Sequence, residues 1–563
     1  MEGSTNNPIH QLLWNKRSLG MWQLLVNLLF MAQPTKSQHY CFTDDTDPYH
    51  QFATKTPYSY SRGHFSSSDL VPEGCVAVQA WHLIRHGTRY PGKDDIARFV
   101  LELPGMQTSI LKAHHKGQGE LCEGDLSLLS GWSLGTLNTS WASILAPEGE
   151  LELEGLASRY KAALPSLFGQ QFSNDSFKFR HTASQRTKAS AIAYSKGLFD
   201  DASVYIPPAL DPDPLLKFYD ICEKYKVEVE DNPAARRESH LFWEGPEMGR
   251  IVDTVSHRLG YPCTKGDLKL LYDACRFYQA WQPAQSSPWC VAFTPHDLEV
   301  LEYYYDLEKY YTAGYGHDIN TAMACPPLQD VYQHFSDVVW RGQGPRGIFY
   351  FTHSKAVISV MARLGLYHDV APLTHRHMDP RRLWRTSQHG SFATNLAFTL
   401  SNCTQNRWWV SMATSEHLAA LEGCEGPTGC SWEEFTQVLS GSLHCDLDII
   451  CAVTPFMTTS GSGCSVEARA GEACQCRSCS PFFLLMFLLN GYDAETLGTR
   501  HSSPHPSTAC CSVLHFLTIP RYTCRVPWTS GIKIPTYRNQ RNTSTAEVNN
   551  RNNSCQAKCQ RST

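Results

Sequence analysis

A histidine lies between two arginines in one short stretch, residues 85–91, which reads Arg-His-Gly-Thr-Arg-Tyr-Pro. Arginine keeps its charge and presents a planar fork of donors that matches phosphoryl oxygens, while a neutral imidazole nitrogen can attack phosphorus. The residue types therefore predict phosphoryl transfer through a phosphohistidine, with His86 as the nucleophile and Arg85 and Arg89 binding the phosphoryl group. Because a lone Arg-His-Gly is more often a surface turn, the surrounding elements must decide between the two interpretations.

Apolar runs place this stretch at the end of a strand. Residues 76–84 form a continuous apolar run that predicts a buried strand, and Gly347–His353 form a second β-rich run that ends on His353. A shorter strand is predicted at 174–180, and later strands at 397–400 and 408–412. Open α/β sheets bind ligands at the carboxyl ends of their strands, so we expect His86 and His353 to meet there.

Helical patterns follow these strands. A strand-to-helix junction is predicted at 181–191, where the backbone N–H groups of a helix start and Arg186 would face an anion. A further helix is predicted at 356–366. An apolar stripe with helical spacing predicts a helix with a buried face, formed by Leu151, Leu153, Leu156, Ala157, Tyr160 and Leu164.

The stretch at 85–91 resembles the signature of the histidine acid phosphatases, and in particular that of the multiple inositol polyphosphate phosphatases. Segments 272–277, 293–303 and 392–398 are similar to segments of the same branch, and the resemblance extends from about 41 to 451. It implies a phosphoglycerate-mutase-like α/β sheet domain with a mostly helical inserted domain. It also implies Arg186 as a third phosphate-binding arginine and His353 as a second histidine that hydrogen-bonds the phosphate.

The resemblance implies a phosphomonoesterase that acts on inositol polyphosphates, with 2,3-bisphosphoglycerate as a second substrate and no metal or other cofactor. The chain departs from the family after the second histidine, where the family has an acid and this sequence has Ser354 and Lys355. The loss of a positioned acid costs roughly 10²-fold to 10⁴-fold in rate. The proton donor stays open between Lys355, a carboxyl from elsewhere and a bound water, and Lys355 is also expected to attract a polyanion.

Three other functions remain open because of this departure. They are a catalytically weakened phosphate-binding or interaction protein, a generic secreted acid phosphatase and a phosphoglycerate-mutase-like transferase. The formal net charge of −5 does not favour nucleic-acid binding, so a small anionic substrate requires a locally basic cleft. The sequence leaves the oligomeric state open.

Composition divides the chain into five parts. These are a signal peptide at 1–37, the α/β phosphatase domain at 38–206 and 336–456, a mostly helical insertion at 207–335, and a cysteine-rich, poorly ordered tail at 457–563.

Several features predict export into the secretory pathway. Basic residues before the apolar segment 19–31 are typical of a signal peptide, with an uncleaved signal anchor as the alternative, and no membrane span is expected after cleavage. The 22 cysteines favour disulfides, and the thirteen between Cys41 and Cys451 leave one unpaired or bonded to the tail. Asn138, Asn174 and Asn402 begin glycosylation sequons. The protein is expected to be secreted, held in the ER lumen or associated with the cell surface.

Overall fold

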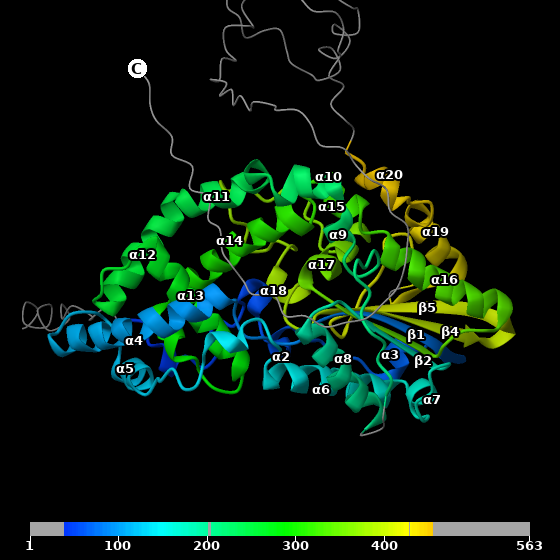
Figure 1. The fold of residues 1–563 in the computed structure, drawn as a ribbon, viewed down its shortest axis with the longest axis horizontal. Helices are drawn as coiled ribbons and strands as arrows, with labels where there is room; N and C mark the ends of the chain where they lie inside the picture. The colour runs from blue at the N-terminus through cyan, green and yellow to red at the C-terminus, as the bar shows by residue number, and fades with distance from the viewer. Residues whose placement is uncertain (1–38, 201–203, 427, 454–563) are drawn as a thin grey trace, which may run out of the picture. The chain divides into compact units, whose positions relative to one another are not determined.

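The computed structural model describes residues 39–200, 204–426 and 428–453, and these residues belong to one unit (Figure 1). The signal peptide predicted at 1–37 and the tail predicted at 457–563 lie outside them. Element labels follow Figure 1. None of the helices in the described ranges combines the length and the apolarity that crossing a membrane requires.

The centre of the fold is a mixed sheet in the order β2-β3-β1-β4-β5-β6, with β7 paired to β5. Its strands are β1 (Cys75–Arg85), β2 (Phe177–His181), β3 (Gly347–Thr352), β4 (Asn395–Cys403), β5 (Arg407–Thr414), β6 (His417–Leu418) and β7 (Gly429–Ser431). The first three strands of the order run parallel, and the others pair antiparallel. The five strands expected from the sequence are confirmed, and so is the α/β fold class.

Alternating side chains give the sheet two apolar faces. On one face Leu83 and Ile348 pack with α16 (Pro326–Arg341), α17 (Ser354–Arg363) and α19 (Trp432–Leu443). On the other face Ile84 and Phe349 pack with α6 (Pro147–Ala163), α7 (Pro165–Phe168) and α8 (Gln185–Phe199). Helices on both faces bury a sheet whose central strands read as continuous apolar runs.

One position of the predicted apolar stripe is wrong. Leu153, Leu156, Ala157, Tyr160 and Leu164 are buried, but Leu151 is 63% exposed. At 100° per residue Leu151 lies two positions, or about 200°, from Leu153, so it faces solvent on the opposite side of α6.

A separate helical region lies beside the sheet (Figure 1). It is formed by α4 (Lys93–His115), α5 (Glu123–Ser130), α11 (Arg237–Glu244), α12 (Pro246–Leu259), α13 (Lys265–Trp281) and α14 (Pro295–Ala313), which share one apolar core. This region therefore draws on two segments of the sequence, whereas one insertion at 207–335 was expected. Those domain boundaries stay predictions.

Short helices complete the chain. They are α2 (Tyr58–Ser61), α3 (Ser67–Leu70), α9 (Phe218–Ile221), α10 (Glu223–Tyr225), α15 (Asp318–Ala322), α18 (Thr386–His389) and α20 (Leu447–Cys451), with the π-helical turn η4 (Lys226–Glu230). The 3₁₀ turns are η1 (Phe42–Asp44), η2 (Ala53–Lys55), η3 (Thr139–Trp141), η5 (Pro233–Arg236), η6 (Pro288–Ala292) and η7 (Thr404–Asn406).

Disulfides connect distant parts of the described chain. They join Cys41 to Cys122, Cys75 to Cys403, Cys222 to Cys451, Cys275 to Cys290, Cys325 to Cys445 and Cys424 to Cys430. Cys263 pairs with no other cysteine of the described residues, which leaves one over, as the odd count predicts. This many disulfides indicate an oxidising compartment of the secretory pathway.

Candidate active site

The carboxyl ends of the three parallel strands bring the predicted histidines together. Arg85 at the end of β1 pairs with Thr352 at the end of β3, and His181 at the end of β2 pairs with Phe351. The residues that follow these strands therefore meet at one edge of the sheet. The ring centroids of His86 and His353 are 5.5 Å apart.

The ring of His86 is held in one tautomer. Its Nδ1 lies 2.8 Å from the carbonyl oxygen of Gly87. Because a carbonyl oxygen only accepts, Nδ1 carries the hydrogen and Nε2 keeps its lone pair. Burial, followed by the charge of Arg85, lowers the pKa of His86 well below its usual range. The side chain is therefore a neutral imidazole whose Nε2 can act as a nucleophile.

His353 is also neutral and is fixed by two partners. Its Nδ1 accepts from Nη2 of Arg186 at 3.3 Å, so its Nε2 carries the hydrogen and donates to Oγ1 of Thr182 at 3.0 Å. Burial, and then the charge of Arg186, lowers the pKa of His353 to about 3. The contact brings Arg186, in the first turn of α8, to the edge where the two histidines lie.

In the described part of the chain, the three predicted arginines are held by carbonyl oxygens or by a histidine. Arg85 donates to the carbonyl oxygens of Thr54 and Gly390 at 2.7 and 2.6 Å, and Arg89 donates to that of Tyr90 at 2.6 Å. Over the described ranges, none of Arg85, Arg89 and Arg186 forms an ion pair with a carboxylate. Burial, and then the charge of Arg186, lowers the pKa of Arg89 to about 10, so it remains charged at neutral pH. Such a cluster of cations is suited to an anion.

The loop that carries His86 is anchored to α6. The carboxylate of Glu152 accepts from the backbone N and Oγ1 of Thr88 at 2.6 and 2.9 Å and from the backbone N of Tyr58 at 3.0 Å. A Cβ at Gly87 would lie 2.4 Å from the carbonyl oxygen of Gly149, so only glycine permits this close approach. Burial nevertheless raises the pKa of Glu152 to about 7.

Sequence reasoning missed Glu152, although a signal was present. Glu152 lies next to Leu153 in the apolar stripe of α6 and is buried. A carboxylate on the buried face of a helix requires several donors, which here come from the catalytic loop.

Lys355 has a different setting from the other predicted site residues. Its Nζ donates to Oε1 of Glu230 at 2.6 Å, and it lies 4.7 and 4.8 Å from the ring centroids of Tyr219 and Tyr225. Lys355 is therefore ion-paired, unlike the three arginines. Its role in substrate binding stays a prediction.

A further cation, Lys55, was not anticipated from the sequence. Burial, followed by the charges of Arg276, Arg89 and Arg85, lowers its pKa well below the usual range for lysine. Lys55 is thus a buried amine near the Arg85 and Arg89 guanidiniums, and their charges disfavour its own positive charge.

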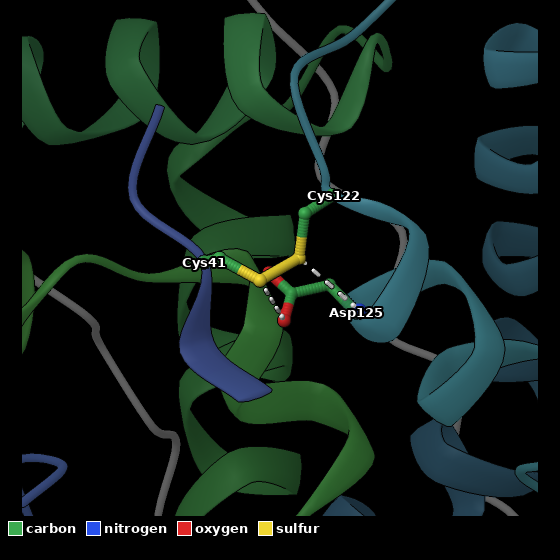
Figure 2. A group of neighbouring side chains, drawn as sticks. All are labelled: Cys41, Cys122 and Asp125. Atoms are coloured by element: carbon green, nitrogen blue, oxygen red, sulfur yellow. Dashed lines mark hydrogen bonds between the residues drawn. A yellow bond between two sulfur atoms is a disulfide. The ribbon is translucent and has the colours of Figure 1, made fainter. Parts of the chain in front are cut away.

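One group of potential metal ligands proves to be structural. Cys41, Cys122 and Asp125 lie close together, but the two sulfurs form a disulfide (Figure 2). The carboxylate of Asp125 is bound by Arg258 at 2.7 Å and by the backbone N of Thr43 at 2.9 Å. Disulfide sulfurs are not thiolates, so these three residues do not provide a metal-ligand set.

Known proteins resemble the chain over most of its described length. The model of the histidine phosphatase superfamily (branch 2) matches residues 78–414. Multiple inositol polyphosphate phosphatase 1 of Drosophila melanogaster is 30% identical over 427 residues, which cover 73% of this chain and 90% of that protein. The Homo sapiens protein of the same name is 30% identical over 382 residues, which cover 62% and 77%.

Solved structures share the fold. The phytase from D. castellii aligns with a TM-score of 0.56 at 16% identity, covering 73% of this chain and 87% of the other. Bifidobacterium longum multiple inositol polyphosphate phosphatase, in its complex with phosphate, aligns with a TM-score of 0.53 at 15% identity, covering 71% and 98%. At these identities the likeness establishes the fold.

Proposed function

Because the chain belongs to the histidine phosphatase superfamily, branch 2, we propose that it hydrolyses phosphate monoesters of inositol polyphosphates through a phosphohistidine at His86. The observation that carries this proposal is the neutral imidazole of His86, with Nε2 available, among three arginines that pair with no carboxylate of the described residues. Its relatives named multiple inositol polyphosphate phosphatase support the substrate class.

The first step is attack of His86 Nε2 on phosphorus, which breaks the bond to the ester oxygen. The lowered pKa of His86 keeps the ring in the free-base form that attack requires. The hydrogen bond from Nδ1 to the Gly87 carbonyl stabilises the positive charge that develops on the ring. Water then attacks the phosphohistidine, and inorganic phosphate leaves.

The arginines stabilise the transferring phosphoryl group. Charge spreads over its equatorial oxygens in the transition state, and planar guanidinium forks from Arg85, Arg89 and Arg186 match those oxygens. Carbonyl oxygens fix Arg85 before substrate arrives, so little reorganisation is needed during the reaction. His353 accepts from Arg186 and so orients that guanidinium, and its Nε2 hydrogen binds the phosphate after it leaves Thr182 Oγ1.

The substrate range that we propose follows the relatives. Inositol polyphosphates of the phytate type are the main class, and 2,3-bisphosphoglycerate is a second substrate. We propose that the protein acts in the ER lumen, at the cell surface or after secretion, in keeping with its disulfides.

A second candidate function is a phosphate-binding protein with weak turnover. It is favoured by one observation, which is that Lys355 stands where the family has its acid and is ion-paired with Glu230. Release of inorganic phosphate from inositol hexakisphosphate distinguishes a turning-over enzyme from such a binder.

The decisive experiment traps the covalent intermediate. Protein is mixed with ³²P-labelled inositol hexakisphosphate and quenched in alkali, in which phosphohistidine survives. We expect label on the wild type, none on His86→Ala, and undiminished label on His115→Ala, which removes an exposed histidine of α4. A wild type that releases phosphate without an acid-labile adduct would contradict the proposal.

A further inference from the structure

The proposed reaction requires a proton at the leaving oxygen, and the immediate surroundings of His86 do not supply it. An inositol alkoxide is a poor leaving group unless it is protonated as it departs. The charged groups that act most strongly on the His86 ring are all basic, namely Arg85, His353, Arg186 and Arg89. Glu152 is occupied in holding the loop. Besides Lys355 and a bound water, this leaves a carboxyl from another element as the donor.

One carboxyl lies beside the residue that stands in place of the family acid. Glu230 accepts a hydrogen bond from Lys355 Nζ at 2.6 Å, and Lys355 follows His353 by two positions at the start of α17. Glu230 ends the π-helical turn η4, a rare local geometry that occurs frequently at functional sites.

A buried tyrosine links this pair to the phosphate-binding arginine. Tyr219 lies under the ammonium of Lys355 and is within electrostatic range of both Arg186 and Glu230. Arg186 in turn donates to His353. Lys355 lies 4.7 Å from the centroid of the Tyr219 ring, and it follows His353 by two positions. The Glu230–Lys355 pair is therefore on the side of α17 that begins at the second histidine of the site.

The same carboxyl faces space for a substrate. Glu230 lines a cavity of about 590 Å³, together with Asp231, Arg236, Arg237 and His240. Small-molecule sites commonly have volumes of roughly 300–1,000 Å³. The cavity can hold a compact polar ring, and Arg236 and Arg237 offer donors to its phosphate groups beside the carboxylates of Glu230 and Asp231.

We propose that Glu230 donates the proton to the leaving oxygen and that Lys355 positions its carboxyl, an inference that rests on the proposed phosphoryl transfer through His86. As the bond between Nε2 and phosphorus forms and the ester P–O bond breaks, the ester oxygen takes the proton of Glu230 and leaves as an alcohol. The Glu230 carboxylate then takes a proton from the water that attacks the phosphohistidine, which restores both side chains.

Substrate binding changes the surroundings of Glu230, because a polyphosphorylated ring brings several negative charges close to the Glu230–Lys355 pair. Phosphate oxygens also compete for the ammonium of Lys355. Lys355 is thus a positioning residue whose ammonium can contact the Glu230 carboxyl and a substrate phosphate together.

Two substrates with different leaving groups test this role. Glu230→Gln is assayed with inositol hexakisphosphate, whose alkoxide needs a proton, and with p-nitrophenyl phosphate, whose phenolate leaves without one. We expect kcat to fall by about 100-fold or more on the inositol substrate and by less than about threefold on the aryl ester. A merely structural role would slow both substrates alike.

Matched variants sharpen the result. Glu228→Gln, at an exposed position of the same turn, is expected to leave both rates unchanged. The double variant Glu230→Gln with Lys355→Glu restores an acid at the family position and is expected to recover the inositol rate. If thermal melting shows that Glu230→Gln does not fold, Glu230→Asp replaces it in the test. For that variant we expect kcat to fall by about tenfold on the inositol substrate only.

The possible failures are distinguishable. Equal effects of Glu230→Gln on the two substrates, or none, overturn this inference while leaving the His86 chemistry in place. A selective loss in Lys355→Met without one in Glu230→Gln assigns the proton to lysine and also overturns it. A wild type that hydrolyses neither substrate and forms no phosphohistidine refutes the proposed function, and this inference with it.

Discussion

Arginines withdrawn from solvent occur in two settings in this protein. At the sheet edge, Arg85, Arg89 and Arg186 lie near one another and form no ion pair with the described carboxylates. In and beside the helical region, Arg258, Arg276 and Arg382 each bind an aspartate, Asp125, Asp273 and Asp306 respectively. Burial lowers the pKa of both Arg89 and Arg258, but at Arg258 the charge of Asp125 opposes this shift, and at Arg382 burial is outweighed by Asp306, so that the pKa is raised.

The difference distinguishes arginines whose charge is used within the protein from arginines whose charge is free to bind a ligand. A buried ion pair satisfies both partners, and loss of one leaves the other unpaired in a medium of low dielectric. An unpaired arginine instead opposes folding slightly and is retained where a ligand supplies the counter-charge. Variants of one arginine from each setting should therefore affect stability and activity in opposite ways.

The largest effect is expected from the structural setting. Arg258→Ala should lower the free energy of unfolding by about 3–5 kcal/mol, because it leaves the buried Asp125 without its cation. It also removes the donor to the Val291 carbonyl at 2.7 Å. Urea denaturation measures the loss, and kcat of the folded fraction should be unchanged. Arg250→Ala, at a 63% exposed side chain of the same helix, serves as the control. Wild-type stability of Arg258→Ala would remove the distinction between the two settings.

The catalytic setting should show the reverse pattern. Arg89→Ala is expected to lower kcat/KM by about 100-fold to 1,000-fold, equivalent to roughly 2.7–4 kcal/mol of transition-state stabilisation. Its free energy of unfolding should stay constant or rise, because repulsion from Arg186 is removed. Arg89→Lys keeps the charge but not the planar fork of donors. Its kcat/KM should therefore lie between that of the wild type and that of Arg89→Ala. Parallel losses of rate and stability in Arg89→Ala would make the arginine structural.

Much of the sheet edge could be predicted because its information is local. The apolar run that became β1 is followed by Arg85 and His86, and the run that became β3 is followed by His353. Parallel strands bring their carboxyl ends to one edge. Arg186 was predictable because it follows β2 in the first turn of a helix. These inferences need only periodicity and the order of elements.

The rest depends on contacts between residues far apart in the chain. Thr88 and Glu152 are 64 positions apart, and Lys355 and Glu230 are 125 apart. No local pattern states that α6 anchors the catalytic loop or that η4 supplies a carboxylate for Lys355. The packing of α4 with α12 and α13 in the helical region could not be predicted either. The apolar stripe of an amphipathic helix shows which face is buried, but not which helix it packs against.

Two histidines extend the comparison to neutral buried groups. The pKa of His353 at the site and that of His389 in the scaffold are both lowered to about 3, in each case first by burial. His353 has two hydrogen-bond partners, whereas both ring nitrogens of His389 lack one and its ring stacks on Tyr367. Replacement of His389 by another aromatic residue should therefore affect packing but no hydrogen bond of the described residues.

The smallest predicted effect is a change in pH dependence. Between about pH 6.5 and pH 3 the unfolded chain binds a proton at His389 that the folded chain does not, so stability falls as pH falls, by about 1.4 kcal/mol per pH unit for each such group. His389→Phe removes this site of proton uptake on unfolding. Between pH 6.5 and pH 5.5 the variant should therefore lose about 1 kcal/mol less of its free energy of unfolding than the wild type does. Urea denaturation at pH 7.5, 6.5 and 5.5 measures the slope. Tyr367→Phe, which alters the same stack without removing an imidazole, should shift stability equally at each pH. An unchanged slope in His389→Phe would mean that the folded protein protonates this ring after all.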